Sequence, residues 1–203
     1  MSASVVTFGE VMGRIASPGS LRFTQALPGM AEFTFGGGEA NVAVSLAILG
    51  ANATFVTALP KNPIADTCVM TLRGLGVDTT KIIRTDGGRL GLYYLETGAN
   101  QRASNVVYDR DHSSLMETTA DAYDWATIFA GAQWFHVTGI TPALSANTAE
   151  ATLLATKAAK AAGLTVSCDL NFRKKLWKWR PGTQQRDLAE ETMRAVLPYV
   201  DVV

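Results

Sequence analysis

The chain has 203 residues, of which 47% are hydrophobic, and its eighteen Lys and Arg side chains balance eighteen Asp and Glu side chains. This length and apolar content are enough for one main domain with a substantial core. A zero net charge gives no global field that attracts nucleic acid or an anionic membrane, so a small-molecule or protein partner is favoured.

Cysteine and histidine usage argues against a metal or disulfide framework. Cys68 and Cys168 lie far apart, with no CxxC or Cys/His spacing, as is typical of a reducing compartment. His136 lies in an apolar run and is expected in the core with a satisfied ring nitrogen, whereas His112 lies in a loop. The chain reaches the apolar run 5–8 without a basic segment, which predicts a strand and not a signal peptide or membrane span. We therefore expect a cytoplasmic protein with no metal site and no membrane partner.

The first third of the chain alternates between strand and helix patterns. Residues 5–8 form an apolar run, and residues 38–49 repeat apolar positions with helical spacing before a glycine. A second strand is predicted over 53–59. Asn62 and Pro63 are suited to the N-cap and first position of a helix that runs to about Leu75. Such alternation indicates βαβ units and a parallel sheet.

The pattern changes between about residues 81 and 110. Short β-rich runs at 81–84, 90–96 and 103–108 are separated by turns rich in glycine and asparagine. These features predict an antiparallel flap inserted into the parallel domain, where it would cover a binding site.

The α/β alternation then resumes. Strands are predicted at 133–137 and 164–168, and helices at about 146–162 and 184–196. The last residues, 199–203, have the pattern of a strand with nothing to pack beside it. The sequence alone therefore suggests an incomplete enzyme with exposed apolar surface at this end.

A glycine triplet at 36–38 leads into the first predicted helix. It can be a tight turn that lets the helix pack on the sheet. Alternatively, its backbone N–H groups face a polar ligand, with Asn41 offering a donor and an acceptor to hydroxyl groups. The segment matches neither a Walker A loop nor GxGxxG. Both interpretations stay open at this point.

Tyr108 and Arg110 end the last flap strand and project to the same side. An arginine beside a phenol suits a carboxylate or a sugar acid, because guanidinium binds carboxylate bidentately. The alternative is an exposed edge strand with a protective charge.

Asp169, Asn171 and Arg173 alternate directly after a predicted strand, at the sheet edge where open α/β proteins bind ligands. The run 171–180 also interleaves basic residues with Phe172, Trp177 and Trp179, a combination found in single-stranded nucleic-acid sites. Zero net charge and the lack of a second such patch favour a solvated basic loop with anchoring tryptophans. We expect no nucleic-acid partner.

Five motifs follow one another along the chain: 7–10, 36–43, 72–79, 135–141, and 169–173 with Leu176 and Trp177. In this order they resemble the ribokinase-like (phosphofructokinase-B) carbohydrate kinases, most closely the 2-keto-3-deoxygluconate kinases. The resemblance covers essentially all 203 residues. It implies a three-layer α/β/α fold with a mostly parallel sheet and a small antiparallel lid, drawn from about residues 13–35 and 81–110.

The resemblance further implies phosphoryl transfer from ATP, with Mg²⁺, to a hydroxymethyl group of a sugar acid, giving 2-keto-3-deoxy-6-phosphogluconate. Substrate hydroxyl groups would be held by Gly37, Gly38 and Asn41, and the lid side of the site would be lined by Tyr93 and Tyr108. Arg110 and Arg173 would neutralise the substrate carboxylate. The remaining substrate-binding positions implied are Gly139 and Asn171.

One part of the family pattern has no match here. The family's Gly-Ala-Gly-Asp motif, whose Asp acts as general base, does not occur, and neither does the nucleotide-binding region. We therefore expect residues 1–203 to be the acceptor-binding N-terminal part of such a kinase, with no catalytic residue of its own and no activity alone. Alternatives are a fructokinase or ribokinase relative and a non-catalytic sugar-acid-binding module. A homodimer or larger homo-oligomer through the lid is also expected.

Overall fold

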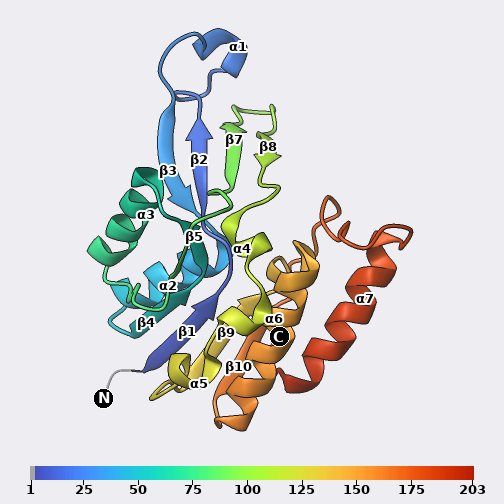
Figure 1. Ribbon diagram of the computed structural model, residues 1–203. Coiled ribbons are helices and arrows are strands. Elements are labelled where there is room, and N and C mark those ends of the chain that lie inside the picture. Colours follow the sequence, from blue (N-terminus) through green and yellow to red (C-terminus); the bar gives the residue numbers. More distant parts are fainter. Residues whose placement is uncertain (1–2) are drawn as a thin grey trace.

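A computed structural model describes residues 3–203 (Figure 1). Its centre is a four-stranded sheet with the order β10-β9-β1-β4, in which all neighbouring strands are parallel. The carboxyl ends of these strands therefore meet at one edge of the sheet. The strands are β1 (Ser4–Phe8), β4 (Asn52–Val56), β9 (Trp134–Thr138) and β10 (Thr165–Asp169).

Helices cover both faces of this sheet, because apolar side chains alternate along the strands. Val6 and Phe8 face a core shared with one helix layer, whereas Phe55 faces a separate core on the other side. One layer holds α2 (Gly38–Ile48) and α3 (Pro63–Gly74), and the other holds α6 (Ala146–Ala161), against which α7 (Gln185–Val196) packs. The predicted three-layer α/β/α class is thus confirmed.

Capping residues set the helix ends where the sequence indicated them. The Asn62 side chain accepts a hydrogen bond from the Ala65 N–H at 2.9 Å, and Pro63 is the first residue of α3. Gly163 follows α6 with φ of 80°, a left-handed conformation that favours glycine. Shorter helical segments are α1 (Phe23–Ala26), α4 (Ser114–Glu117) and α5 (Trp125–Ile128), with 3₁₀ turns at Ala120–Ala122, Thr141–Ala143 and Leu197–Tyr199.

A second sheet forms the lid, which rises above the carboxyl edge of the central sheet (Figure 1). Its order is β3-β2-β7-β8, with β2 (Met12–Ala16), β3 (Glu32–Gly36), β7 (Leu92–Glu96) and β8 (Asn105–Asp109). Each hairpin is antiparallel, but β2 and β7 are parallel where the two hairpins meet. The lid is therefore mixed and not purely antiparallel as predicted.

Two predicted strands differ from the structure near the lid. The run 53–59 divides into β4 and β5 (Ala58–Pro60), because the chain leaves the central sheet at the buried Thr57. The run 81–84 was expected in the flap. Instead β6 (Ile83–Thr85) pairs in parallel with β5, and the Ile83 N–H donates to the Thr57 carbonyl at 2.9 Å.

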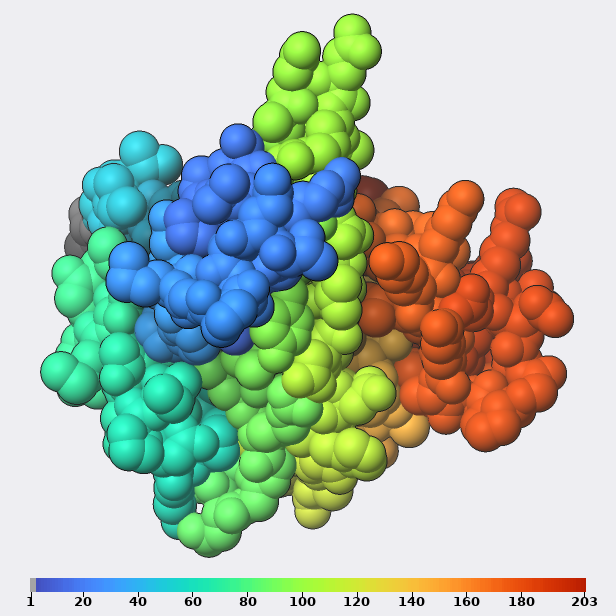
Figure 2. All heavy atoms as spheres, turned by 90° about the horizontal axis from the view of Figure 1, so that it is seen from above, coloured from blue at the N-terminus to red at the C-terminus, as the bar shows by residue number. Residues whose placement is uncertain are grey.

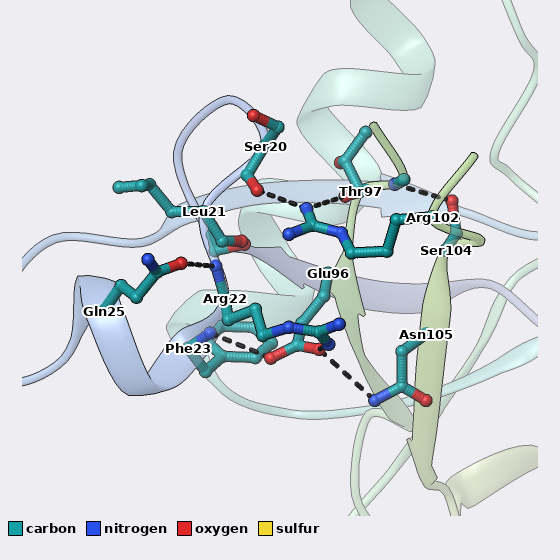
Figure 3. Close-up of polar contacts among 12 residues, drawn as sticks. Ser20, Leu21, Arg22, Phe23, Gln25, Glu96, Thr97, Arg102, Ser104 and Asn105 are labelled. Carbon is teal, nitrogen blue, oxygen red and sulfur yellow. Dashed lines mark hydrogen bonds and ion pairs between the residues drawn. The ribbon is translucent and has the colours of Figure 1, made fainter. Parts of the chain in front are cut away.

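Polar contacts join the two halves of the lid at its far end (Figure 3). The Glu96 carboxylate accepts from the Phe23 N–H at 2.9 Å and pairs with Arg22 at 3.1 Å. The hydrogen bond from the Phe23 N–H is the main reason that the pKa of Glu96 is lowered. Arg102 donates to the Ser20 carbonyl. The segment that carries α1 is thereby tied to the β7–β8 hairpin, whose tip protrudes in Figure 2.

The last residues lie beside β10. The Cys168 N–H donates to the Val202 carbonyl at 2.9 Å, and Val202 forms a single parallel bridge with Ser167. The expectation of a terminal strand without a neighbour is therefore wrong. The expected exposure of apolar surface is confirmed, since Val203 is 75% exposed.

Both cysteines, Cys68 and Cys168, are free and buried, and burial raises the pKa of each thiol to about 12. His136 is half-buried, so its expected position in the core is wrong, but its Nδ1 lies 2.9 Å from the Ser167 hydroxyl oxygen, which confirms the predicted satisfied ring nitrogen. Within residues 3–203, no helix is long and apolar enough to cross a membrane.

Candidate functional site: a groove under the lid

A groove of about 970 Å³ lies between the lid and the carboxyl edge of the central sheet. One wall comes from the lid strands β7 and β8, and the opposite wall comes from the loop that follows β10. The start of α2 contributes the floor. All predicted substrate-binding residues except Gly139 line this groove: Gly37, Gly38, Asn41, Tyr93, Tyr108, Arg110, Asn171 and Arg173.

The glycine turn at the start of α2 combines packing with an open groove face. A Cβ atom on Gly37 would lie 2.0 Å from the Glu10 carbonyl oxygen, so no other residue fits there without a shift of the backbone. Gly38 has ordinary van der Waals room, with the Thr138 methyl 3.6 Å from its Cβ position. The close approach of the Glu10 backbone thus explains why Gly37 is a glycine. Gly38 and the exposed Asn41 line the groove and are accessible to a ligand.

Glu39 is a buried carboxylate that the sequence did not single out. Its Oε1 atom accepts hydrogen bonds from the Thr138 hydroxyl at 2.8 Å, the Thr138 N–H at 3.1 Å and the Thr141 hydroxyl at 2.7 Å. Burial raises the pKa of Glu39 against the opposing effect of these hydrogen bonds. A Cβ on Gly9 would lie 2.2 Å from the Glu39 carboxyl carbon. Glu39 therefore joins the start of α2 to the ends of β1 and β9 beneath the groove.

Two tyrosines face each other on the lid wall. Tyr93 on β7 and Tyr108 on β8 are directly opposite in register, with ring centroids 6.1 Å apart. Desolvation raises the pKa of Tyr93, so its hydroxyl is a neutral hydrogen-bonding group. The Arg110 guanidinium carbon lies 5.7 Å from the centroid of the Tyr108 ring. The predicted grouping of Tyr108 and Arg110 on one side is confirmed.

Arg110 is buried and paired, and is not the exposed charge on an edge strand that the alternative interpretation predicted. It follows β8, is only 8% exposed and forms an ion pair with the equally buried Glu10, which follows β1. The exposed-edge interpretation of Arg110 is therefore wrong. The sequence gives Glu10 only as part of the motif 7–10 and does not reveal its partner, since the two residues lie 100 positions apart in the chain.

The loop after β10 carries cations on an anchored backbone. Arg173, Lys174 and Lys175 line the groove, are exposed and form no ion pair with any other residue in 3–203. Trp177 is 1% exposed, and the Trp179 indole N–H donates to the Pro142 carbonyl at 3.2 Å. The tryptophans thus hold the loop to the body of the protein, as the anchoring interpretation predicted.

Gly139 lies between the ends of β9 and β10 and outside the groove lining. Its Cβ position is 2.1 Å from the Leu170 carbonyl oxygen, and its N–H donates to the Asp169 carbonyl at 2.8 Å. The glycine lets the two segments approach closely, so that the neighbouring Ile140 reaches the groove. Asp169 accepts a hydrogen bond from the Asn171 N–H at 3.1 Å and so shapes the turn toward Arg173. In the described part of the chain, no three His, Cys, Asp or Glu side chains are grouped to hold a metal ion.

Comparison with known proteins agrees with this architecture. The chain is 38% identical over 204 aligned residues to a 2-dehydro-3-deoxygalactonokinase of Haloferax volcanii. The alignment covers 100% of this chain and 60% of the relative. It is 31% identical to the 2-dehydro-3-deoxygluconokinase of Bacillus subtilis, with 87% of this chain and 54% of the relative covered. The chain thus spans little more than half the length of these relatives.

A solved structure gives the same picture. The 2-dehydro-3-deoxygluconokinase of Thermotoga maritima superposes with a TM-score of 0.90 at 44% identity, covering 98% of this chain and 59% of that one. A fructokinase of Xylella fastidiosa with bound ATP superposes with a TM-score of 0.79 at 27% identity. The match covers 100% of this chain and 57% of the fructokinase chain. The family model for pfkB carbohydrate kinases matches residues 2–203. The chain therefore belongs to the pfkB family of carbohydrate kinases.

Proposed function

We propose that the protein is the acceptor-binding part of a kinase for a 2-keto-3-deoxy sugar acid, either the gluconate or its galactonate isomer. The observation that carries the proposal is the position of Arg173, which forms no ion pair with residues 3–203, on the groove opposite the tyrosine pair of the lid. A guanidinium suits a carboxylate, and phenols suit hydroxyl groups. The names of the kinases from Haloferax volcanii and Bacillus subtilis support the same substrate class.

The groove residues have separate roles in this proposal. Gly37, Gly38 and Asn41 bind substrate hydroxyl groups through backbone N–H groups and an amide, and Asn171 adds a second amide near the sheet edge. The phenols of Tyr93 and Tyr108 close the lid side. Arg110 and Arg173 face the acid group. Gly139 contributes through the close approach of its backbone, which brings the loop after β10 into place.

ATP is the proposed phosphoryl donor, with Mg²⁺ as its companion ion. The residues present fit only the phosphate end of ATP, because Lys174 and Lys175 offer two cations along one rim of the groove, next to the Arg173 that is assigned to the acid group. When bound, ATP would supply the terminal phosphoryl group that the substrate hydroxymethyl oxygen accepts. These side chains would hold the two anions near each other, since such transfers depend on positioning and charge stabilisation. No residue of this chain is assigned as general base.

A neutral-sugar kinase is the second candidate within the family. Fructokinases also match, for example that of Klebsiella pneumoniae at 33% identity over 153 residues. A neutral substrate would not use the Arg173 charge. The candidate outside catalysis is a sugar-acid-binding module.

Assembly of two or more copies through the lid is a further proposal. Phe33 and Val107 are exposed on the lid strands and are available for such a contact. Light scattering that shows the complete protein to be a monomer would contradict this proposal.

The test is an ATP-dependent phosphorylation assay on a sample of known intact mass. Acceptors are 2-keto-3-deoxygluconate, 2-keto-3-deoxygalactonate, fructose and ribose. We expect no turnover from a protein of 21.7 kDa, but turnover of a keto-deoxy acid by a longer natural form. Preferred turnover of fructose or ribose by the longer form would contradict the sugar-acid assignment.

A further inference from the structure

Glu10 and Arg110 form a buried ion pair on the groove. Arg110 Nη2 donates to Glu10 Oε2, and the two residues are 8% and 5% exposed respectively. Both line the groove. Such a pair has no net charge, so the positive charge of Arg110 is already compensated by the chain itself.

The pair also has unused hydrogen-bonding capacity. Glu10 Oε1 and Arg110 Nε are buried and have no hydrogen-bond partner among the described residues. Buried carboxylate and guanidinium atoms usually have hydrogen-bond partners, because a buried polar atom without one destabilises the folded state by its full desolvation free energy. Here one acceptor and one donor remain unmet in residues that line a ligand-sized groove. The Tyr108 ring beneath the guanidinium helps to hold Arg110 in this place.

The opposite wall carries charge of another kind. Arg173 is exposed, lies on the groove and forms no ion pair with residues 3–203. An incoming carboxylate gains more from an uncompensated cation than from one that already has a counter-ion. The groove therefore contains one compensated and one uncompensated arginine, and the two are not equivalent toward an acid.

We infer that Glu10 is a specificity-determining residue, which limits Arg110 to directional hydrogen bonds and leaves the net attraction for an acid to Arg173. The inference rests on the proposed function and refines it. Glu10 acts through Arg110: it holds the guanidinium in place and cancels its charge. The preference for a sugar acid over a neutral sugar then depends on the basic loop after β10.

Binding of 2-keto-3-deoxygluconate and fructose to the chain and its variants tests this division. Glu10→Gln keeps the shape but removes the counter-charge, so the acid-to-neutral affinity ratio should rise by about tenfold. The double variant Glu10→Gln/Arg110→Gln exchanges one neutral pair for another, so its ratio should stay within about threefold of the wild type. A double variant that loses acid preference as fully as Arg173→Gln would overturn the inference.

A measurement without ligand separates this inference from the proposed function. Glu10→Gln and Arg110→Gln should each lower the melting temperature by roughly 6 to 20 °C, because each leaves one buried charge unpaired. The double variant should lose less than the sum of the two. The control Asp86→Asn breaks the exposed Lys61–Asp86 pair and should have little effect. Additive losses would overturn the inference, whereas a wild type that binds neither sugar but shows this coupling would contradict the proposed function alone.

Discussion

The Thr141 hydroxyl donates to Glu39 Oε1 at 2.7 Å, and so joins the turn after β9 to the first turn of α2. Glu39 is 1% exposed, and its Oε1 atom also accepts two hydrogen bonds from Thr138. The floor of the groove is therefore set by a buried acid between segments that are distant in the chain. The geometry of the glycine turn depends on this contact.

Removal of the Glu39 carboxyl should destabilise the protein, and an isosteric amide should destabilise it much less. Glu39→Ala leaves the Thr138 and Thr141 donors without an acceptor in a buried place, at a cost of at least about 2 kcal/mol. Glu39→Gln keeps an oxygen acceptor and should cost less than half as much. Urea unfolding at pH 6 measures both, and equal losses for the two variants would argue against this role.

The same residue should make stability depend on pH. Its pKa is raised in the folded protein, so its stabilising contribution is complete below the unfolded value of about 4.5 and declines as the pH rises toward the folded pKa. Glu39→Gln lacks this titration. The difference in unfolding free energy between wild type and Glu39→Gln should therefore fall as the pH rises from 4.5. A difference that is constant with pH would contradict the buried, proton-binding carboxyl.

Gly139→Ala should destabilise the protein by about 1–3 kcal/mol or more, because its methyl group would lie 2.1 Å from the Leu170 backbone oxygen. Gly74→Ala is the matched control, since Gly74 lies in α3 with nothing within 4 Å of its Cβ position. There alanine should stabilise by up to about 1 kcal/mol. Thermal melts of the two variants should move in opposite directions; a neutral Gly139→Ala would show that β9 and β10 do not approach so closely.

Trp177→Ala should release the basic loop from the body of the protein. Trp177 packs with Ala143, Leu188 and Ala189, and its loss should cost about 3–5 kcal/mol. Trp179→Phe keeps an aromatic ring but removes the hydrogen bond to the Pro142 carbonyl and part of the packed indole, and should cost about 1–2 kcal/mol. Limited proteolysis should cut Trp177→Ala first within residues 170–183. Equal resistance of wild type and Trp177→Ala would contradict the anchoring role.

The lid tie at Glu96 should weaken in acid. The pKa of Glu96 is lowered by the hydrogen bond from the Phe23 N–H and by the nearby Arg22, so the tie is present above the ordinary value of 4.5 and is lost as the pH falls through the lowered pKa. Glu96→Ala should speed hydrogen exchange of the Phe23 amide at pH 6. An unchanged rate would indicate that the lid is held by other contacts.

The alternation of elements could be predicted from local signals in the sequence. Asn62 and Pro63 marked the start of α3, and apolar runs marked the strands of the central sheet. The mixed arrangement of the lid strands could not be predicted from the sequence, because the β2–β7 pairing joins segments that are far apart in the chain. The short β6 was placed in the lid for the same reason, since its pattern does not reveal which strand it pairs with.

The groove was predicted in outline, and its buried acids were missed. Tyr108 and Arg173 were singled out because their side chains suit a polar ligand near the end of a strand, whereas Tyr93 was expected only from the resemblance to the carbohydrate kinases. Glu39 resembles an ordinary acid in the first turn of a helix, where a solvent-facing position is common. Its burial, like the pairing of Glu10 with Arg110, follows from tertiary contacts that no local pattern encodes.

The most direct test of the account is calorimetric titration of the 203-residue chain with 2-keto-3-deoxygluconate. The wild type should bind the acid more tightly than fructose, and Arg173→Gln should weaken acid binding by about tenfold or more. Lys178→Gln, a charge change in the same loop but outside the groove lining, should leave the affinity unchanged. Equal binding of acid and fructose, with no effect of Arg173→Gln, would contradict a groove built for a sugar acid.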